Sequence, residues 1–467
     1  MWSAAVLPPR EVRDLPESPR NLWKLVGPGI VASGIGLSSG EFILWPYIAS
    51  QVGLVLLWGA LLGVVTQFFI NMEVERYTLA TAETVVTGFN RFWKHWGLVF
   101  ALMTYFANAW PGWAFSSATL TTYLFGGNAA VIGVIELLII GAALTLAPVI
   151  YVALERLIFV KVAAVVILVI LAMAFVVQAD SWRALPSGIT NIGHIPPGLP
   201  IALIFGAIAF AGAGGGQNLC QSNYIRDKGF GMGQYVPRLV SPLTGSEVAV
   251  PDVKSFIFEP TPANMARWRR WWNFANIEQF LSFVVVTVVT IGLTSMLAHS
   301  TLFGEQGLPT SVAFLQIEAQ RLTDRVGRWF GVLFLGIGAF SLFGSAMGIV
   351  DYTSRLAADT IKTTYLRTSS ITESRLYVWL VWGMVAFGCG IVSLRLVQPL
   401  VLLIISASIG GTMMFMYSIL LLMLNRTHLP DAIRIRSYRV AAIAWAVLFF
   451  GTLAALTIWA QLASLRS

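Results

Sequence analysis

Apolar residues run along the chain in long blocks that are separated by short polar stretches. A helix needs about 20 mostly apolar residues to cross a bilayer, and eleven blocks reach that length. The pattern therefore predicts about eleven membrane-spanning helices. They cover approximately residues 25–50, 53–74, 97–125, 129–149, 157–178, 200–224, 274–297, 329–350, 376–394, 398–424 and 440–462.

The composition excludes a water-soluble globule. Of the 467 residues, 57% are hydrophobic and only 11% are charged, whereas soluble proteins are about 25% charged. We expect an all-α, multi-pass protein of the plasma membrane whose surroundings are the lipid bilayer. Residues 25–462 form a single transmembrane domain, between a solvated tail at 1–24 and a short tail at 463–467.

The net charge of +8 indicates an orientation in the membrane rather than a nucleic-acid partner. Cytoplasmic loops carry an excess of Lys and Arg. The connections between these spans lie alternately on the two sides of the membrane, and those on one side hold most of the 30 basic residues. The connections on the other side hold only six of them, namely Arg183, Arg321, Arg325, Arg328, Arg395 and Arg466. We therefore expect the N-terminus to be cytoplasmic and the C-terminus external.

Two polar connections are long enough to hold structure of their own. Residues 225–273 contain Arg267, Arg269 and Arg270 beside Trp268, Trp271 and Trp272, which predicts a helix on the membrane surface anchored by Trp and Arg. Residues 300–328 are expected to hold another short surface helix.

The sequence contains no arrangement typical of an enzyme or of a cofactor. Cys220 and Cys389 lie in apolar runs, so we interpret both as packing residues. No Ser-His-Asp, HExxH or phosphate-loop pattern is present. We expect no catalytic activity and no bound cofactor.

Two spans are interrupted by small and polar residues. The first contains GPGIVASGIGLSSGEF and the sixth contains GAIAFAGAGGGQNLCQSN. Non-helical backbone at membrane depth is tolerated only inside protein or beside a watery cavity, and two such spans in corresponding positions indicate an inverted-repeat transporter. We expect repeats at about 25–178 and 200–424, with an extra helix at 440–462. The first break is predicted at Ser38–Gly40, where freed carbonyls and Glu41 face a substrate cavity.

These stretches resemble the Nramp (natural resistance-associated macrophage protein) family of divalent metal transporters. The resemblance rests on GPGIVASGIGLSSGEF, GLVLLWGALLGVVTQF, ALERLIFVKVAAVVILV and GAGGGQNL in this order and spacing. It implies a leucine-transporter-type fold of five-plus-five inverted repeats, with helices 1 and 6 broken and with alternating access.

The residues that bind metal in that family are only partly kept. Ser38 stands at the family's Asp, Glu41 replaces its Asn, and Gly40 matches. In the sixth span Gly215 stands at the Met, Gly216 and Gln217 replace Pro-His, and Asn218 matches. The resemblance thus implies a substrate site made of the following residues: Ser38, Gly40, Glu41, Gly215, Gln217 and Asn218.

The chemistry implied by these exchanges differs from that of the family. Without the soft Met ligand, a metal would be held by oxygen alone, from Glu41, Ser38, Gln217 and Asn218, which suits Mg²⁺, Ca²⁺ and Mn²⁺. We therefore expect a secondary transporter that moves divalent metal cations by alternating access. The alternative is the same fold transporting a small organic solute, such as an amino acid or amine, which the enlarged site also fits. The third span has no acid where the family has its proton path, so we expect no coupling of the usual kind. A non-transporting sensor is a third alternative.

Several of these residues also have a purely structural interpretation. Glu41 is a functional candidate because a carboxylate in lipid is costly; a structural ion pair is the alternative. Gln217 and Asn218 could be hydrogen-bond links between spans. The set that we expect to line the cavity or form gates, with packing or helix anchoring as the alternative, is Trp110, Trp113, Asn276, Glu278, Ser406 and Thr412. Asp351 and Arg355 are spaced as a helix ion pair.

Overall fold

The computed structural model describes the whole chain except residues 1–6, 20–26, 246–254, 310, 395–398 and 465–467. Eight continuous helical runs in the described part are long and apolar enough to cross a membrane. They are α3 (Leu57–Thr81), α7 (Ala129–Leu146), α8 (Ile150–Phe175), the run from α12 through η4 to α13 (Pro262–Leu302), α15 (Arg328–Thr364), α16 (Glu373–Leu394), α17 (Pro399–Thr427) and α18 (Tyr438–Ser464).

Three further spans are interrupted, which brings the number of spans to the eleven that the hydrophobic pattern predicts. Their segments are α1 (Pro28–Gly36), η2 (Ser39–Leu44) and α2 (Trp45–Val52) in the first; α5 (Trp96–Asn108) and α6 (Gly112–Phe125) in the third; and α10 (Ile201–Ala209) and α11 (Gly216–Lys228) in the sixth. The third break was not predicted. It falls at Pro111, whose ring cannot continue a helix interior without loss of a hydrogen bond.

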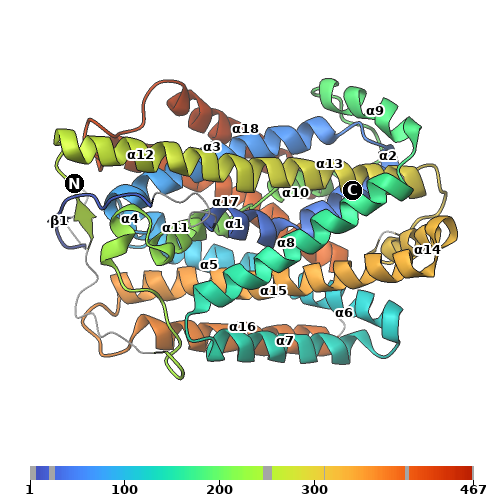
Figure 1. Cartoon of the computed structure of the whole chain (residues 1–467), viewed down its shortest axis with the longest axis horizontal. Helices are drawn as coiled ribbons and strands as arrows, with labels where there is room; N and C mark the ends of the chain where they lie inside the picture. Colours follow the sequence, from blue (N-terminus) through green and yellow to red (C-terminus); the bar gives the residue numbers. More distant parts are fainter. Residues whose placement is uncertain (1–6, 20–26, 246–254, 310, 395–398, 465–467) are drawn as a thin grey trace.

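Short elements lie at the two ends of the bundle (Figure 1). One end, here called the N-terminal end, holds α4 (Val85–Phe89), η3 (Gly231–Tyr235) and the parallel pair of β1 (Glu11–Val12) and β2 (Phe256–Ile257). The opposite end, here called the distal end, holds α9 (Ala179–Thr190) and α14 (Phe314–Val326). Helix α14 confirms the short helix expected in residues 300–328, whereas α9 was not predicted.

The segment before the first span is not a solvated tail where the structure describes it. Leu15 is fully buried, and its backbone N–H donates to the Asn264 side chain at 3.1 Å. Residues 11–12 pair with β2, and Trp271 donates from its indole nitrogen to the Pro16 carbonyl at 2.9 Å. The expectation of a solvated tail is therefore wrong where the segment packs on the bundle, as at Leu7 and Leu15, whereas Val12 and Glu17 are exposed. Residues 1–6 and 20–24 of that tail lie outside the described residues, as do Arg395, Arg466 and residues 465–467 of the other tail.

The Arg- and Trp-rich part of residues 225–273 is not a separate surface helix. Helix α12 continues through η4 into α13 without a break, so the helix that contains the seventh span begins at Pro262 rather than near residue 274. Trp271 has no exposed surface and packs against Phe230, with ring centroids 5.5 Å apart. The predicted role of Trp271 as an interfacial anchor is therefore wrong, because its ring is buried inside protein.

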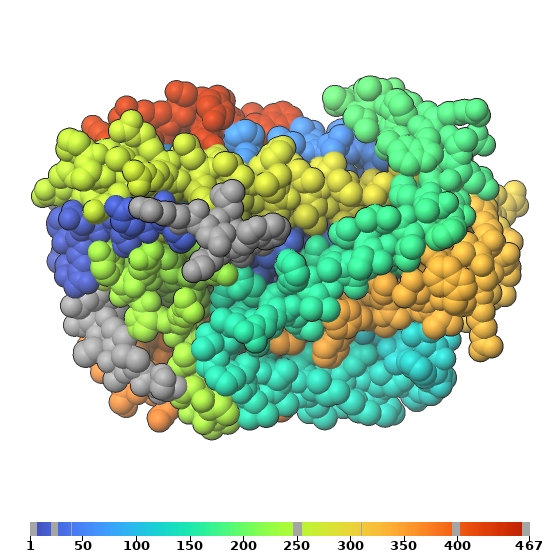
Figure 2. Space-filling model, viewed as in Figure 1, coloured from blue at the N-terminus to red at the C-terminus, as the bar shows by residue number. Residues whose placement is uncertain are grey.

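Helices α8 and α15 flank the first span. Helix α8 runs diagonally across one face of the molecule, between α13 and α15, and forms a continuous band on the surface (Figures 1 and 2). Behind it, the whole of α1 is buried. The first span thus lies in the interior of the bundle, where polar or non-helical backbone is shielded from lipid.

A buried charge network joins α11, α15 and α16 toward the N-terminal end. The expected pair forms, with Arg355 Nη2 2.8 Å from Asp351 Oδ1. Arg355 also pairs with Asp227, and the hydroxyls of Tyr224 and Tyr377 donate to Asp351 at 3.0 and 2.7 Å. A helix pair predicted from spacing alone is therefore one part of a link between three helices.

Candidate functional site at the crossing of two broken helices

The first span breaks at Leu37 and Ser38. Helix α1 ends at Gly36, and the π-helix η2 begins at Ser39. The break predicted at Ser38–Gly40 therefore exists but begins one residue earlier. Gly40 already lies inside η2, and a π-helical turn within a span is itself a frequent mark of a functional site.

The glycine run of the sixth span supplies backbone angles that other residues rarely adopt. Gly212, Gly214 and Gly215 have φ angles of +107°, +75° and +55°. A side chain is strained in this region, whereas glycine enters it at little cost. The run is therefore required by the shape of the break between α10 and α11, as the sequence pattern indicated.

The two breaks touch each other through their backbones. A Cβ atom at Gly36 would overlap the carbonyl oxygen of Gly212, and one at Gly40 would overlap the carbonyl oxygen of Phe210. Only glycine permits this approach. The crossing is buried, since Glu41 is 1% exposed and Gln217 is 2% exposed.

The carbonyls freed by the first break are already hydrogen-bonded. Three side-chain hydroxyls from neighbouring spans donate to them: Ser345 to Ile35, Ser341 to Leu37 at 2.7 Å, and Thr294 to Glu41 at 2.6 Å. The expectation that these carbonyls face a cavity is wrong for this conformation. Buried backbone acceptors need partners, and α13 and α15 supply them.

Gln67 of α3 holds the sixth break in place. Its amide nitrogen donates to the carbonyls of Ala209 and Ala211 at 3.2 and 2.9 Å, and its oxygen accepts from the N–H groups of Ala213 and Gly214 at 3.1 and 2.9 Å. One side chain thus replaces four helical hydrogen bonds. Gln67 was not among the predicted site residues, although a lone amide in an apolar span was a signal that could have identified it.

Glu41 lies inside the crossing with an unsatisfied carboxylate. Neither carboxylate oxygen has a hydrogen-bond partner among the described residues. The backbone groups that act on the carboxylate are its own and those of Gly212 and Ser38. The opposing charge that acts on it is the ammonium of Lys161 in α8. The charge that acts on Glu41 thus comes from a lysine of the fifth span.

Lys161 is the second charged group of the site, and the sequence analysis missed it. Its side chain has no exposed surface, and its ammonium donates to the Ser345 hydroxyl, which in turn donates to the Ile35 carbonyl. The ammonium is therefore tied through one hydroxyl to the backbone of the first break. A lone lysine in the middle of an apolar span was the available signal.

Gln217 and Asn218 presently make hydrogen bonds between spans. Gln217 donates to the carbonyl of Ala32 in α1, and Asn218 donates to Asn71 Oδ1 of α3 at 2.6 Å. The Asn218 carbonyl oxygen has no partner among the described residues. Gly215 packs against Gly410 of α17, where its Cβ would lie 2.8 Å from the Gly410 Cα. The sixth-span candidates therefore do lie at the crossing.

The two tryptophans of the third span lie in different places. Trp113 packs against Phe210 of the sixth break, with ring centroids 6.0 Å apart. Trp110 packs against Phe387 of α16 at the same distance. Trp113 is thus a neighbour of the crossing, whereas the contact of Trp110 is with a helix that does not form it.

The remaining cavity candidates are engaged elsewhere. Asn276 accepts from Arg439 at 2.6 Å. Glu278 accepts from the N–H of Gly29 at 3.0 Å, so it caps α1 rather than its own helix. Ser406 donates to the carbonyl of Ala107 in α5, and Thr412 donates to Ser408 of its own helix at 3.0 Å. The anchoring interpretation agrees with these contacts.

The crossing offers few groups that hold metal ions. Within the described part of the chain, no three His, Cys, Asp or Glu side chains come together as a possible metal site. The oxygens available are those of one carboxylate, one hydroxyl and two amides, from Glu41, Ser38, Gln217 and Asn218. Lys161 places a positive charge beside the single carboxylate.

Comparisons with known proteins identify the fold. No family model and no curated protein matches the sequence. Solved structures do match: the manganese transporter of Eremococcus coleocola in complex with an aromatic bis-isothiourea compound superposes with a TM-score of 0.70 at 13% identity, over 98% of this chain and 90% of that one. A mutant of that transporter gives 0.69, at the same identity and coverage.

A second kind of transporter shares the arrangement less closely. Mhp1, of the nucleobase-cation-symport-1 family, in a closed conformation with bromovinylhydantoin bound, gives a TM-score of 0.51 at 13% identity, over 97% of this chain and 96% of that one. The chain is thus an all-α, multi-pass membrane protein. It has the leucine-transporter-type fold of five-plus-five inverted repeats, with helices 1 and 6 broken.

Proposed function

We propose that this chain is a secondary transporter that moves a small organic solute by alternating access through the crossing of the two breaks. Two discontinuous spans that meet near the middle of a bundle form the substrate site in transporters of this architecture. The burial of Glu41, Gln217 and Asn218 corresponds to a state in which the crossing is closed to solvent.

The observation that carries the choice of substrate is the presence of one buried acid, Glu41, and one buried base, Lys161, near enough for their charges to act on each other. A carboxylate and an ammonium at one place give no net charge, and they complement a solute that carries both signs, such as an amino acid. A bare dication is held best by several anionic oxygens, and a neighbouring ammonium opposes it by Coulomb repulsion. The geometry therefore favours the organic solute.

A divalent metal is the second candidate, in an Nramp-related transporter with an oxygen-only site. The sequence resemblance supports it, and a manganese transporter shares the fold, but a likeness of fold does not extend to the ligands. A metal bound at Glu41 would be opposed by the positive charge of Lys161, which acts on that carboxylate. Binding calorimetry separates the two candidates, because removal of Lys161 should strengthen binding of a metal ion but weaken binding of an organic solute.

The experiment is binding calorimetry with the purified protein in detergent, using separate panels of amino acids, amines, Mn²⁺ and Mg²⁺. We expect heat with at least one amino acid or amine and none with either metal. Glu41→Gln and Lys161→Met each remove one of the two opposite buried charges and leave the other without it, so we expect both single variants to be less stable than the wild type. The double variant Glu41→Gln/Lys161→Met removes both charges, so we expect it to fold and to lose binding of the organic solute.

Two results would overturn parts of this proposal. Heat with Mn²⁺ that grows in Lys161→Met and vanishes in Glu41→Gln establishes the metal candidate instead. Unchanged binding of the organic solute in the folded double variant removes the crossing as the site. The sensor alternative is tested by uptake into proteoliposomes, where a sensor gives binding without accumulation.

The driving force and the orientation are further parts of the proposal. The third span lacks the acids of the usual Nramp proton path, so we expect transport without that coupling; substrate-dependent acidification of proteoliposomes contradicts this. We propose a plasma-membrane location with the N-terminal end of the bundle in the cytoplasm. Labelling of a single cysteine introduced at Arg183 from outside intact cells tests the orientation.

A further inference from the structure

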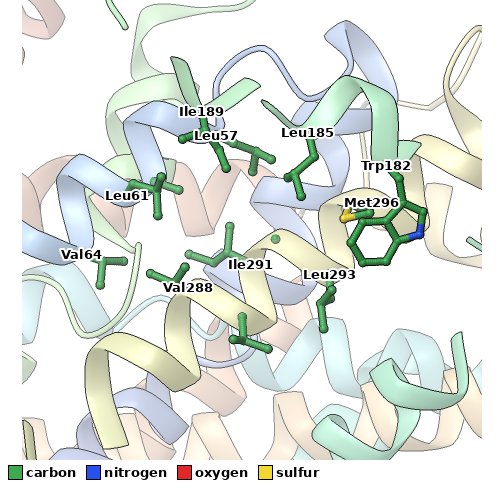
Figure 3. Close-up of a pocket in the computed structure, with 13 residues that line it drawn as sticks. Leu57, Leu61, Val64, Trp182, Leu185, Ile189, Val288, Ile291, Leu293 and Met296 are labelled. Atoms are coloured by element: carbon green, nitrogen blue, oxygen red, sulfur yellow. The ribbon is translucent and has the colours of Figure 1, made fainter. Parts of the chain in front are cut away.

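An apolar pocket lies between α3, α9 and α13, on the distal half of the bundle (Figure 3). Side chains from the three helices point toward one another around a cavity of about 190 Å³. Its walls include Leu57, Leu61 and Val64 of α3, Trp182, Leu185 and Ile189 of α9, and Val288, Ile291, Gly292 and Met296 of α13.

The walls of this pocket contain hardly any polar groups. The side chains named above end in carbon or sulfur, apart from the indole nitrogen of Trp182. An apolar cavity of about 150 Å³ inside a protein stays dry and binds small apolar molecules. A pocket of this size and chemistry therefore takes a hydrocarbon rather than water or an ion.

Helix α9 forms a fixed cover over the pocket. At its first turn, the Ser181 hydroxyl lies 2.8 Å from His299 Nδ1 and 2.6 Å from the Ser300 hydroxyl, both on α13. At its last turn, Gly188 packs closely against the carbonyl of Leu54, just before α3. The cover is thus attached to both helices that it bridges, and the space beneath it is part of the fold.

The pocket is open to the side, toward the surroundings of the bundle. Val289 is 44% exposed and Trp182 is 49% exposed, whereas Ile291 and Met296 at the inner wall are buried. In a multi-pass membrane protein, a side opening between two spans faces the bilayer, whose hydrocarbon chains are the apolar molecules present there at the highest concentration.

We propose that this pocket binds one hydrocarbon chain of a bilayer lipid. The chain enters between Val289 and α9 and lies against Ile291 and Met296. This occupant follows from the apolar walls, the side opening and the two membrane-spanning helices that frame it, and it is independent of the transported solute.

The bound chain also stabilises the position of α13 relative to the crossing. On another face of that helix, the Thr294 hydroxyl donates to the Glu41 carbonyl at 2.6 Å. Ile291 and Met296 of the pocket wall lie within three residues of Thr294 along α13. A lipid chain that fills the pocket therefore supports the helix that holds the first break.

Gly292 offers a way to fill the pocket without disturbing the fold. It lines the cavity, and a Cβ atom there meets no heavy atom within 4 Å. The side chain in Gly292→Leu therefore occupies the space that we assign to the lipid. Gly336→Leu is the matched control, because Gly336 is a half-buried helical glycine in α15, its Cβ also meets nothing within 4 Å, and it does not line the pocket.

The test is photo-crosslinking of the full-length protein in vesicles that contain a phosphatidylcholine with a diazirine in the middle of one acyl chain. Labelled peptides are mapped by mass spectrometry. We expect strong labelling of residues 288–296, and a decrease of about tenfold in Gly292→Leu, which corresponds to about 1.4 kcal/mol of binding free energy. Gly336→Leu keeps the labelling of the wild type.

Two outcomes would overturn the proposal. One is labelling of residues 288–296 that is no stronger than that of the exposed face of α16, which indicates ordinary contact with bulk lipid. The other is equal labelling in Gly292→Leu and the wild type while both elute as folded monodisperse protein. Neither measurement involves a transported solute, so failure of the proposed transport function leaves this test unaffected.

Discussion

Gly36 and Gly212 meet backbone to backbone where the first and sixth spans cross, and neither position has room for a side chain that points into the contact. A Cβ at Gly36 would overlap the Gly212 carbonyl oxygen, and one at Gly212 would lie 2.6 Å from the ring of Phe283. Because the obstacle at Gly36 is backbone, rotation of a side chain cannot relieve it. The close crossing therefore depends on these two glycines.

The first prediction follows from this contact. Gly36→Ala should lower the stability of the protein by at least about 1–3 kcal/mol, the usual cost of overpacking, because the Gly212 carbonyl must move. The measurement is the apparent melting temperature in detergent. Gly336→Ala is the control: its Cβ meets nothing within 4 Å, so the gain in helix propensity should keep or raise the melting temperature. Equal melting temperatures for Gly36→Ala and the wild type would contradict the close crossing.

Two acids in the C-terminal half of α3, Glu73 and Glu75, should respond in opposite ways to the same substitution. Glu73 accepts from Arg76 at 2.6 Å and from Asn425 at 3.0 Å, and it lies 3.4 Å from Arg439. Glu75 is equally buried, but neither of its oxygens has a hydrogen-bond partner in the described part of the chain.

Glu73→Gln should therefore destabilise the protein by about 3–5 kcal/mol, because it leaves buried guanidinium groups unpaired. Glu75→Gln replaces a buried carboxyl group that has no hydrogen-bond partner, so no ion pair is lost and the melting temperature should stay the same or rise. The two variants are each other's control, since they make the same chemical change on one helix. A large loss of stability in Glu75→Gln would show that the carboxyl group of Glu75 does make a stabilising hydrogen bond, which would contradict this prediction.

The sequence predicted the membrane-spanning helices well, because a helix that crosses lipid needs about 20 mostly apolar residues and such a block is visible in the sequence. Eleven apolar blocks became eleven spans, and the glycine run of residues 212–216 became a break with positive φ angles. The break at Pro111 was missed, since its flanks are apolar on both sides and Pro is tolerated in membrane helices.

The site was predicted only in part, because its partners come from distant parts of the chain. Glu41 and Gln217 were found from their local context. Lys161, which opposes Glu41, and Gln67, which holds the sixth break, are single polar residues whose roles depend on which helices pack together. Periodicity shows that a span exists, but it does not show which neighbour a given face meets.

The attachment of the N-terminal segment should be lost in acid. Glu83, just after α3, accepts from Arg10 at 3.0 Å and pairs with Arg91. Burial raises the pKa of the Glu83 carboxyl, but the charges of Arg10 and Arg91 outweigh this and lower that pKa from its usual 4.5 to about 2. A lowered pKa means that the ionised form stabilises the fold above pH 4.5 and that this contribution disappears as the pH falls from 4.5 to 2.

We therefore expect hydrogen exchange in residues 10–16 to accelerate over that pH range in the wild type, after correction for the intrinsic rate. Glu83→Gln should show the faster exchange already at pH 7, with little further change in acid. Glu17→Gln is the control, because the Glu17 side chain is 67% exposed and lies 3.4 Å or more from its partners. Slow exchange at pH 7 in Glu83→Gln would mean that the backbone contacts of residues 10–16 hold this segment in place without the ion pairs of Glu83.

At the distal end, Glu318 of α14 should make the protein less stable as the pH rises. The side chain is 1% exposed; Thr301 donates to one oxygen at 3.4 Å, and the other has no partner among the described residues. Burial raises the pKa of Glu318 from 4.5 to about 8. The fold therefore binds this proton more tightly than the unfolded chain does, and stability falls as the pH rises from 4.5 to 8.

Glu318→Gln keeps the shape and the neutral state of the side chain at every pH. Its melting temperature should match that of the wild type below pH 4.5 and exceed it by a growing margin up to pH 8. The corresponding gain in the free energy of unfolding is at most on the order of 5 kcal/mol. Glu305→Gln, which alters a partly exposed carboxylate paired with Arg321, should show no such trend. Parallel melting curves for Glu318→Gln and the wild type across this range would mean that the carboxylate is solvated or paired, and that α14 lies less tightly against α13 than its burial indicates.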